Sequence, residues 1–150
     1  MLDATPLLRL CARYRRRQLA DLDPVATQTS QLRHLVRTAG ETRFGREHGF
    51  AQIETVADFQ ARVPLRRYED FWQDYWRDAF PRLDGVTWPG LMPYFAVSSG
   101  TTQGSTKFLP CSAAMVRSNR LAAADLLVHH IANRPRSRLL GGRSFMLGGS

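Results

Sequence analysis

The first 40 residues carry apolar positions at helical spacing, separated by polar positions. One apolar face is formed by Leu7, Leu8, Cys11, Tyr14 and Leu19, and a second by Val25, Leu32, Leu35 and Val36. Thr5 before Pro6 and Asp23 before Pro24 each place a capping side chain ahead of a proline that suits the first helical turn. Gly40 suits a helix C-terminus. The pattern predicts one helix over about 6–20 and another over 24–40.

Helical periodicity stops between residues 42 and 50, where two glycines and two phenylalanines fall close together. Glycines at this density indicate a packed connection rather than a regular element. Thr55 then has the position of a helix N-cap, and Pro64 ends any helix that follows. We expect a short helix there, ending at about Arg62.

An aromatic stripe follows at i, i+3, i+4, i+7 and i+8. It consists of Tyr68, Phe71, Trp72, Tyr75 and Trp76. All five fall on one face of a regular helix. The spacing favours a helix anchored in a core, which predicts a buried stripe. The alternative is an exposed platform on which nucleic-acid bases stack beside Arg66, Arg67 and Arg77.

The pattern changes after residue 80. Prolines and glycines over 81–93 indicate a loop, residues 94–97 read as a buried strand, and residues 107–110 as a returning strand. Ser112 caps a predicted helix that reaches about Ile131, and residues 138–140 and 144–147 predict a final strand region. The expected fold is α/β, with a helical part over 1–80 and a strand, loop, strand and helix over 93–150.

Composition narrows the setting. The formal net charge is +8 and the sequence pI is about 10.7, so the surface attracts anions, but charge alone does not choose among them. Cys11 and Cys111 are too few for a disulfide framework and lack CxxC spacing. No leader and no run of roughly 18 apolar residues is visible, which predicts a cytoplasmic protein. The arginine-rich segment 7–19 leaves a transit-peptide or membrane-surface helix as the less favoured alternative to a solvated basic face.

No metal site is visible in the sequence. His129 and His130 are adjacent near a predicted helix end, where two neighbouring side chains cannot easily face one metal, and no Cys or carboxylate lies at ligand spacing. We interpret both as cations at a helix C-terminus.

The loop between the two predicted strands carries the chemistry of a polyphosphate site. Such a site needs glycines for close backbone approach, hydroxyl donors and a cation. The glycines are Gly100 and Gly104, and the cation is Lys107, the one lysine beside 20 arginines. The hydroxyl donors are Ser98, Ser99, Thr101, Thr102, Ser105 and Thr106.

Its spacing excludes three common loops. A Walker A loop has lysine directly after its second glycine, whereas Lys107 lies three residues beyond Gly104. The dinucleotide pattern GxGxxG is absent as well. A GxSxG nucleophile elbow fails because neither Ser98 nor Ser99 has a glycine two residues before it. P-loop kinases, dinucleotide dehydrogenases and serine hydrolases are thereby disfavoured.

The string Ser-Ser-Gly-Thr-Thr-x-Gly-x-x-Lys-x-x-Pro over 98–110 resembles the phosphate-binding motif of the auxin-responsive (Gretchen Hagen) family of acyl-acid amido synthetases, which are adenylate-forming relatives of the acyl-CoA synthetases and firefly luciferase. Upstream landmarks of that family recur in the same order over about 30–150. They are Thr42, Phe44-Gly45-Arg46-Glu47-His48-Gly49-Phe50, Asp58-Phe59, Val63-Pro64-Leu65 and Tyr68-Glu69-Asp70.

The resemblance implies a ligase that uses ATP and Mg²⁺. A carboxylic acid attacks the α-phosphate of ATP, pyrophosphate leaves, and an amine, typically that of an amino acid, takes the acyl group. The residues matched to ATP-phosphate binding are Ser98, Ser99, Gly100, Thr101, Thr102, Gly104 and Lys107. No catalytic residue is assigned.

The resemblance also implies that the 150 residues form an N-terminal fragment of an adenylate-forming domain, without the C-terminal domain. We expect helices packed on the start of an incomplete sheet whose open edges favour self-association. The chain alone is not expected to adenylate an acid. The alternative function is a small basic nucleic-acid-binding module, which predicts an exposed stripe and salt-sensitive oligonucleotide binding.

Overall fold

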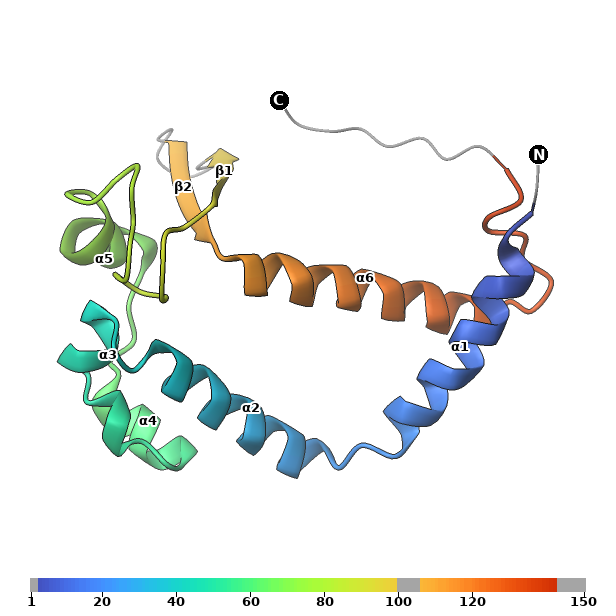
Figure 1. Ribbon diagram of the computed structural model, residues 1–150, viewed down its shortest axis with the longest axis horizontal. Coiled ribbons are helices and arrows are strands. Elements are labelled where there is room, and N and C mark those ends of the chain that lie inside the picture. Colours follow the sequence, from blue (N-terminus) through green and yellow to red (C-terminus); the bar gives the residue numbers. More distant parts are fainter. Residues whose placement is uncertain (1–2, 100–105, 143–150) are drawn as a thin grey trace. The chain divides into compact units, whose positions relative to one another are not determined.

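A computed structural model describes residues 3–99 and 106–142. The chain divides into two compact units, one of residues 1–22 with 117–150 and the other of residues 23–116. Within the described residues there are six α-helices and one two-stranded antiparallel sheet, so the predicted α/β class is confirmed (Figure 1).

The first unit pairs helix α1 (Thr5–Ala20) with most of helix α6 (Ala113–Asn133). Its core is Ala12, Val128 and Ile131. The Arg15 guanidinium donates two hydrogen bonds to the Asp125 carboxylate, at 2.7 and 2.9 Å. A bidentate pair of this kind fixes geometry as well as adding energy. Both helices lie where the sequence predicts them.

Two predictions in this unit are wrong in detail. Thr5 is not an N-cap but the first residue of α1, and its N–H donates to Asp3 Oδ1 at 2.9 Å. Residues 138–140 form no strand, because the Leu140 N–H donates to the Thr5 hydroxyl at 3.0 Å and the Gly141 N–H closes a turn onto Arg138 O. The amide that a neighbouring strand would need is thus used by a side chain. The predicted strand at 144–147 lies outside the described residues.

The second unit begins with helix α2 (Pro24–Ala39), which the Asp23 carboxylate caps by accepting from the N–H groups of Val25 and Ala26. Residues 42–50 are not an irregular connection: they contain helix α3 (Arg43–Glu47), and the short 3₁₀-helix η1 (Phe50–Gln52) starts at their end. The Thr42 hydroxyl accepts from the Gly45 N–H at 3.0 Å, which gives α3 a cap that glycine content alone conceals.

Helix α4 (Val56–Arg62) has Thr55 as its N-cap, as predicted. Thr55 and Asp58 form a reciprocal capping box, in which each side chain accepts from the other residue's backbone N–H. Around these elements lies the main core of the unit, which is made of Val36, Ala39, Phe44, Phe50, Ile53 and Tyr75.

The aromatic stripe lies on helix α5 (Tyr68–Phe71) and the π-helical turn η2 (Trp72–Trp76), not on one regular helix. The Arg77 N–H donates to Trp72 O, five residues back, at 2.8 Å. With this geometry Tyr75 meets Phe44 in the core while Trp72 faces the strands. Tyr75 is 4% exposed and the other four aromatics are half-buried, as the core interpretation predicts.

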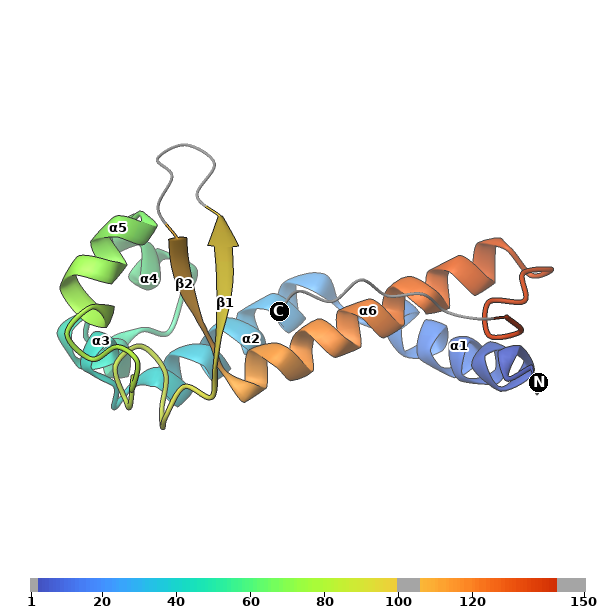
Figure 2. The same cartoon turned by 90° about the horizontal axis from the view of Figure 1, so that it is seen from above.

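Strand β1 (Tyr94–Ser99) pairs with strand β2 (Thr106–Cys111) in antiparallel register (Figure 2). Both strands are predicted correctly and are longer than expected. The expected burial of 94–97 is wrong, since Tyr94 is 60% and Val97 65% exposed. Within the described residues the sheet has two strands. Phe95 and Phe108 pack against Phe80, whereas Tyr94 and Leu109, the adjacent residues on their strands, are exposed.

In the part of the chain that the structure describes, no helix is long and apolar enough to cross a bilayer.

Candidate functional site

Aromatic rings attach the β1–β2 hairpin to the helical part of the second unit. Phe80 lies between the two, with its ring centroid 5.5 Å from Trp72, 5.1 Å from Phe95 and 5.0 Å from Phe108. The rings of Trp72 and Phe108 also stack at 6.4 Å. Figure 1 shows α5 beside β2 in this arrangement. Aromatic pairs at these separations add stabilisation beyond that of the apolar area they bury. The hairpin therefore has a defined position on α5 and η2.

Tyr68, the first residue of α5, binds the outer edge of β2. The Phe108 N–H donates to the Tyr68 hydroxyl at 2.9 Å. This amide lies on the edge that faces away from β1, and an unpaired edge amide otherwise requires water or another strand. The contact ties the start of α5 to the residue directly after Lys107.

Lys107 lies at the loop end of β2 and contacts both of the first two residues of α5. Its Nζ is 2.5 Å from Glu69 Oε1 and 4.8 Å from the centroid of the Tyr68 ring. The hydrogen bond from Lys107 holds the pKa of the Glu69 carboxyl below its usual range. An ammonium above a tyrosine face and beside a carboxylate has two attractive partners. The cation is thus held in one place at the loop end of the hairpin.

Strand register brings the described part of the predicted phosphate site together. Ser98 pairs with Lys107 and Ser99 with Thr106. Of the remaining predicted site residues, Gly100, Thr101, Thr102 and Gly104 lie outside the described residues. The structure therefore places the two ends of the predicted loop side by side, with hydroxyl and ammonium groups on adjacent strands.

The sequence does not indicate that Tyr68 and Glu69 lie beside Lys107. It places Tyr68 in the aromatic stripe and gives Glu69 no role of its own. Both belong to the Tyr68-Glu69-Asp70 landmark, but its separation in sequence from the loop gives no sign of the contact with Lys107. Only the packing of α5 on β2 reveals it.

An apolar pocket of about 360 Å³ lies at the end of the hairpin opposite the loop. Its lining residues come from η2, the 81–93 loop, the end of β2 and the start of α6: Trp76, Thr87, Trp88, Met92, Leu109, Pro110, Ser112 and Met115. The Trp76 indole N–H donates to the Thr87 hydroxyl at 3.3 Å. The pocket offers shape and apolar contact, with few polar groups to orient a ligand.

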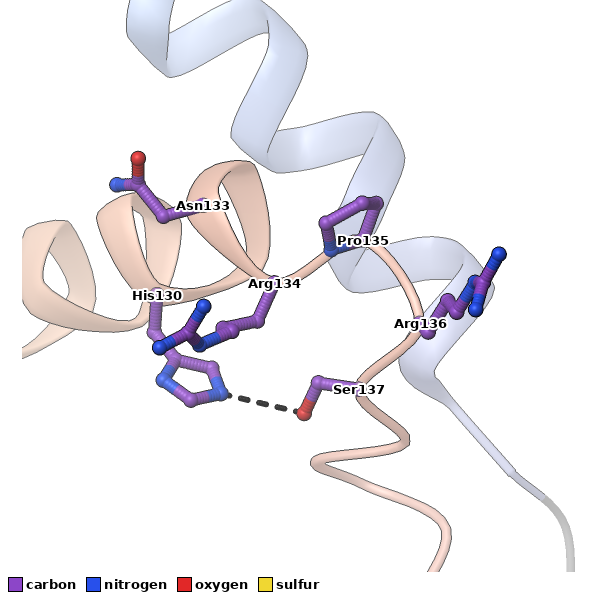
Figure 3. A pocket seen from close by; sticks show the side chains of 6 residues that line it. All are labelled: His130, Asn133, Arg134, Pro135, Arg136 and Ser137. Carbon is purple, nitrogen blue, oxygen red and sulfur yellow. Dashed lines mark hydrogen bonds between the residues drawn. The ribbon is translucent and has the colours of Figure 1, made fainter.

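A second pocket lies in the first unit, at the C-terminal end of α6 (Figure 3). His130, Asn133, Arg134, Pro135, Arg136 and Ser137 line it. A His130 ring nitrogen lies 3.2 Å from the Ser137 hydroxyl. His130 is in the last turn of α6, where the sequence predicts a cation at a helix end. Among the described residues no three His, Cys, Asp or Glu side chains form a cluster that could hold a metal ion.

Comparison with known families gives one match. Residues 15–147 fit the model described as the GH3 family N-terminal domain. No curated protein and no solved structure matches the chain. The match covers both the upstream landmarks and the β1–β2 hairpin.

Proposed function

This chain belongs to the GH3 family, and from that membership we propose that it takes part in ATP-dependent activation of a carboxylic acid and its transfer to an amine. The carboxylate attacks the α-phosphorus of ATP, the bond to pyrophosphate breaks, and an acyl-adenylate forms. The amine, typically that of an amino acid, then attacks the acyl carbon, and AMP leaves. In this proposal the chain contributes the site for the ATP phosphates.

The observation that carries the proposal is the position of Lys107 opposite Ser98 at the loop end of a fixed hairpin. Nucleotidyl transfer depends on positioning and on charge stabilisation more than on covalent chemistry by the protein. An ammonium and hydroxyl donors fixed on adjacent strands suit phosphate oxygens. The proposed phosphate ligands are those of the sequence motif: Ser98, Ser99, Gly100, Thr101, Thr102, Gly104 and Lys107.

Magnesium enters this proposal with the nucleotide. Mg²⁺ is commonly held by substrate phosphates and one or two carboxylates, with water completing its shell. The donors proposed here are hydroxyls, amides and one ammonium, which suit phosphate oxygens rather than a cation. When bound, the ion would neutralise charge on the phosphates.

Packing of the aromatic stripe supports the enzyme proposal over a nucleic-acid module. A stacking platform needs exposed aromatic faces, whereas Tyr75 is buried and the other rings pack against the core or the hairpin. We place the activity in the cytoplasm, with ATP, a carboxylic acid and an amino acid as partners. We also propose that the outer edge of β1 offers a route to self-association.

The test of the phosphate site is Lys107→Gln in the 150-residue protein, with Mg–ATP binding measured by calorimetry. One charge-assisted hydrogen bond contributes about 1.5 to 3 kcal/mol, so we expect affinity to fall by about 10-fold or more. Arg82→Gln removes the same charge from an exposed position of the same unit and should leave affinity within about twofold. Equal binding by wild type and Lys107→Gln, with both proteins folded, contradicts the assignment.

A further inference from the structure

We infer that Glu69 is a resident counter-ion of Lys107, which the nucleotide displaces when it binds. The inference rests on the proposed function and concerns the same site. It starts from one geometry: the Glu69 carboxylate oxygen lies 2.5 Å from Nζ of the chain's single lysine, where the proposal requires a phosphate oxygen. The Glu69 carboxylate oxygen therefore occupies the position beside Lys107 that is proposed for a phosphate oxygen.

Exposure of the pair makes the exchange feasible. The Lys107 side chain is 28% and the Glu69 side chain 53% exposed. An ion pair this accessible to water is worth at most about 1 kcal/mol, because water and salt compensate both charges when it opens. A triphosphate carries several negative charges and offers oxygens to several donors at once. A triphosphate therefore outcompetes the Glu69 carboxylate for Lys107, whereas a weakly bound monovalent anion does not displace it.

Tyr68 keeps the lysine in place during the exchange. The ammonium lies above its ring, and the Tyr68 hydroxyl is bonded to the Phe108 N–H on the same strand. When Glu69 leaves, these contacts remain available to Lys107. A lysine that is already held loses less side-chain freedom on binding, which favours affinity.

Neighbouring charged groups are engaged elsewhere. The Asp70 carboxylate accepts from the Arg67 N–H at 2.7 Å, and Asp74 pairs with Arg66 at 2.5 Å. Among the acidic residues that the structure describes on α5 and η2, Glu69 is the one paired with Lys107. The counter-ion role therefore falls on Glu69.

The experiment combines calorimetry with nuclear magnetic resonance of protein labelled only at lysine, in which Lys107 gives the one lysine signal. Wild type, Glu69→Gln and Asp78→Asn are titrated with Mg–ATP. Asp78 pairs with its neighbour Arg77 on the exposed surface, so its variant changes net charge equally without touching the site. Lys107→Gln and the double variant Glu69→Gln/Lys107→Gln complete a cycle.

We expect Glu69→Gln to bind Mg–ATP about three- to fivefold more tightly, the ratio that an exposed ion pair can supply. Asp78→Asn should change affinity less than twofold, and the gain from Glu69→Gln should vanish in the Lys107→Gln background. The lysine signals of wild type and Glu69→Gln should differ without nucleotide and converge at saturation, because Lys107 then contacts phosphate in both.

Two results overturn the inference in distinguishable ways. If ATP binds and weakens with Lys107→Gln, but Glu69→Gln binds no more tightly and the saturated signals stay apart, the phosphate site stands and Glu69 is not displaced. If ATP moves neither lysine signal and calorimetry shows no binding, the proposed function fails and takes the inference with it.

Discussion

At the scale of single residues, a group of polar contacts joins the buried Tyr75 to Glu47 and Arg43 at the surface of the second unit. The buried Tyr75 hydroxyl donates to Glu47 Oε2 at 2.6 Å, and Arg43 Nε donates to Glu47 Oε1 at 3.0 Å. The guanidinium carbons of Arg43 and Arg66 lie 5.2 and 5.4 Å from the Tyr75 ring centroid. These contacts satisfy a hydroxyl that burial would otherwise penalise.

The same contacts shift two pKa values in opposite directions. Burial, and then the hydrogen bond to Glu47, raise the pKa of Tyr75 to about 12. Hydrogen bonds from Tyr75 and then Arg43 lower the pKa of Glu47. A lowered carboxyl pKa gives stability that is present above the unfolded-state pKa and is lost as pH falls through the folded value. A raised tyrosine pKa gives stability that is lost as pH rises from about 10 towards 12.

Tyr75→Phe tests this pair because it keeps the ring and removes the hydroxyl. We expect the free energy of unfolding at pH 7 to fall by about 1 to 2 kcal/mol, since Glu47 loses one partner of its charged hydrogen bonds. The loss should shrink below pH 4 and above pH 11. Denaturant unfolding across pH measures it.

Tyr94→Phe is the matched control, because Tyr94 belongs to the same unit and is 60% exposed. It should change stability by less than about 0.5 kcal/mol at every pH. A pH-independent loss in Tyr75→Phe would mean that the hydroxyl acts through packing and not through Glu47.

At the scale of elements, α3 approaches the end of α2 closely at Gly45. A Cβ added to Gly45 would lie 2.1 Å from Ala39 O and 2.8 Å from Gly40 O. The first N–H groups of α3 are bonded on its other side, with Arg43 donating to Gly85 O at 2.9 Å and Phe44 to Val86 O at 3.0 Å. The short helix is fixed between two backbone segments and cannot move aside.

Gly45→Ala should therefore lower the free energy of unfolding by about 3 kcal/mol or more, the upper range for an inserted methyl group, because it meets rigid backbone. Gly40→Ala is the contrast, since its nearest contact is 3.3 Å away and its backbone is right-handed helical, with φ −54°. We expect less than about 1 kcal/mol there. Similar losses at both positions would show that α3 does not approach α2 this closely in solution.

Capping signals explain why most elements are predictable from sequence. Each of three side chains, those of Asp23, Thr55 and Ser112, accepts a hydrogen bond from the backbone of the helix that follows. The start of each helix can therefore be predicted from a few adjacent residues. The helix within 42–50 is not predicted, because its cap, Thr42, is followed by a segment whose glycines indicate a connection. The strand predicted at 138–140 fails because its partner is a side chain more than 130 positions earlier in the sequence. Such long-range contacts leave no local pattern.

The candidate site also has one part that the sequence predicts and one part that it does not. Lys107 and the hydroxyls stand out because they lie together in one segment with one chemistry. Tyr68 and Glu69 lie beside Lys107 only because Phe80 packs against Trp72, Phe95 and Phe108. A stripe of aromatic residues predicts that α5 and η2 are buried, but not that β2 is what covers them.

At the scale of the whole molecule, nucleotide binding and catalysis are separate steps with separate requirements. Every residue assigned to the site is proposed to bind the ATP phosphates. Formation of an acyl-adenylate also needs the acid held in line with the α-phosphorus, within about 3 to 3.5 Å of it. No residue of this chain is assigned to the acid, the amine or the adenine, so binding of Mg–ATP does not by itself imply activation.

We therefore predict that the purified 150-residue protein binds Mg–ATP but does not exchange labelled pyrophosphate into ATP when carboxylic acids are added. Exchange requires the adenylate to form and revert, so it reports the acid site independently of the amine. ATP binding is measured on the same preparation, so that a lack of exchange is not due to unfolded protein. A GH3 enzyme of established activity serves as the positive control. Robust acid-dependent exchange, lost in Lys107→Gln, would refute the separation and place the acid site within these residues.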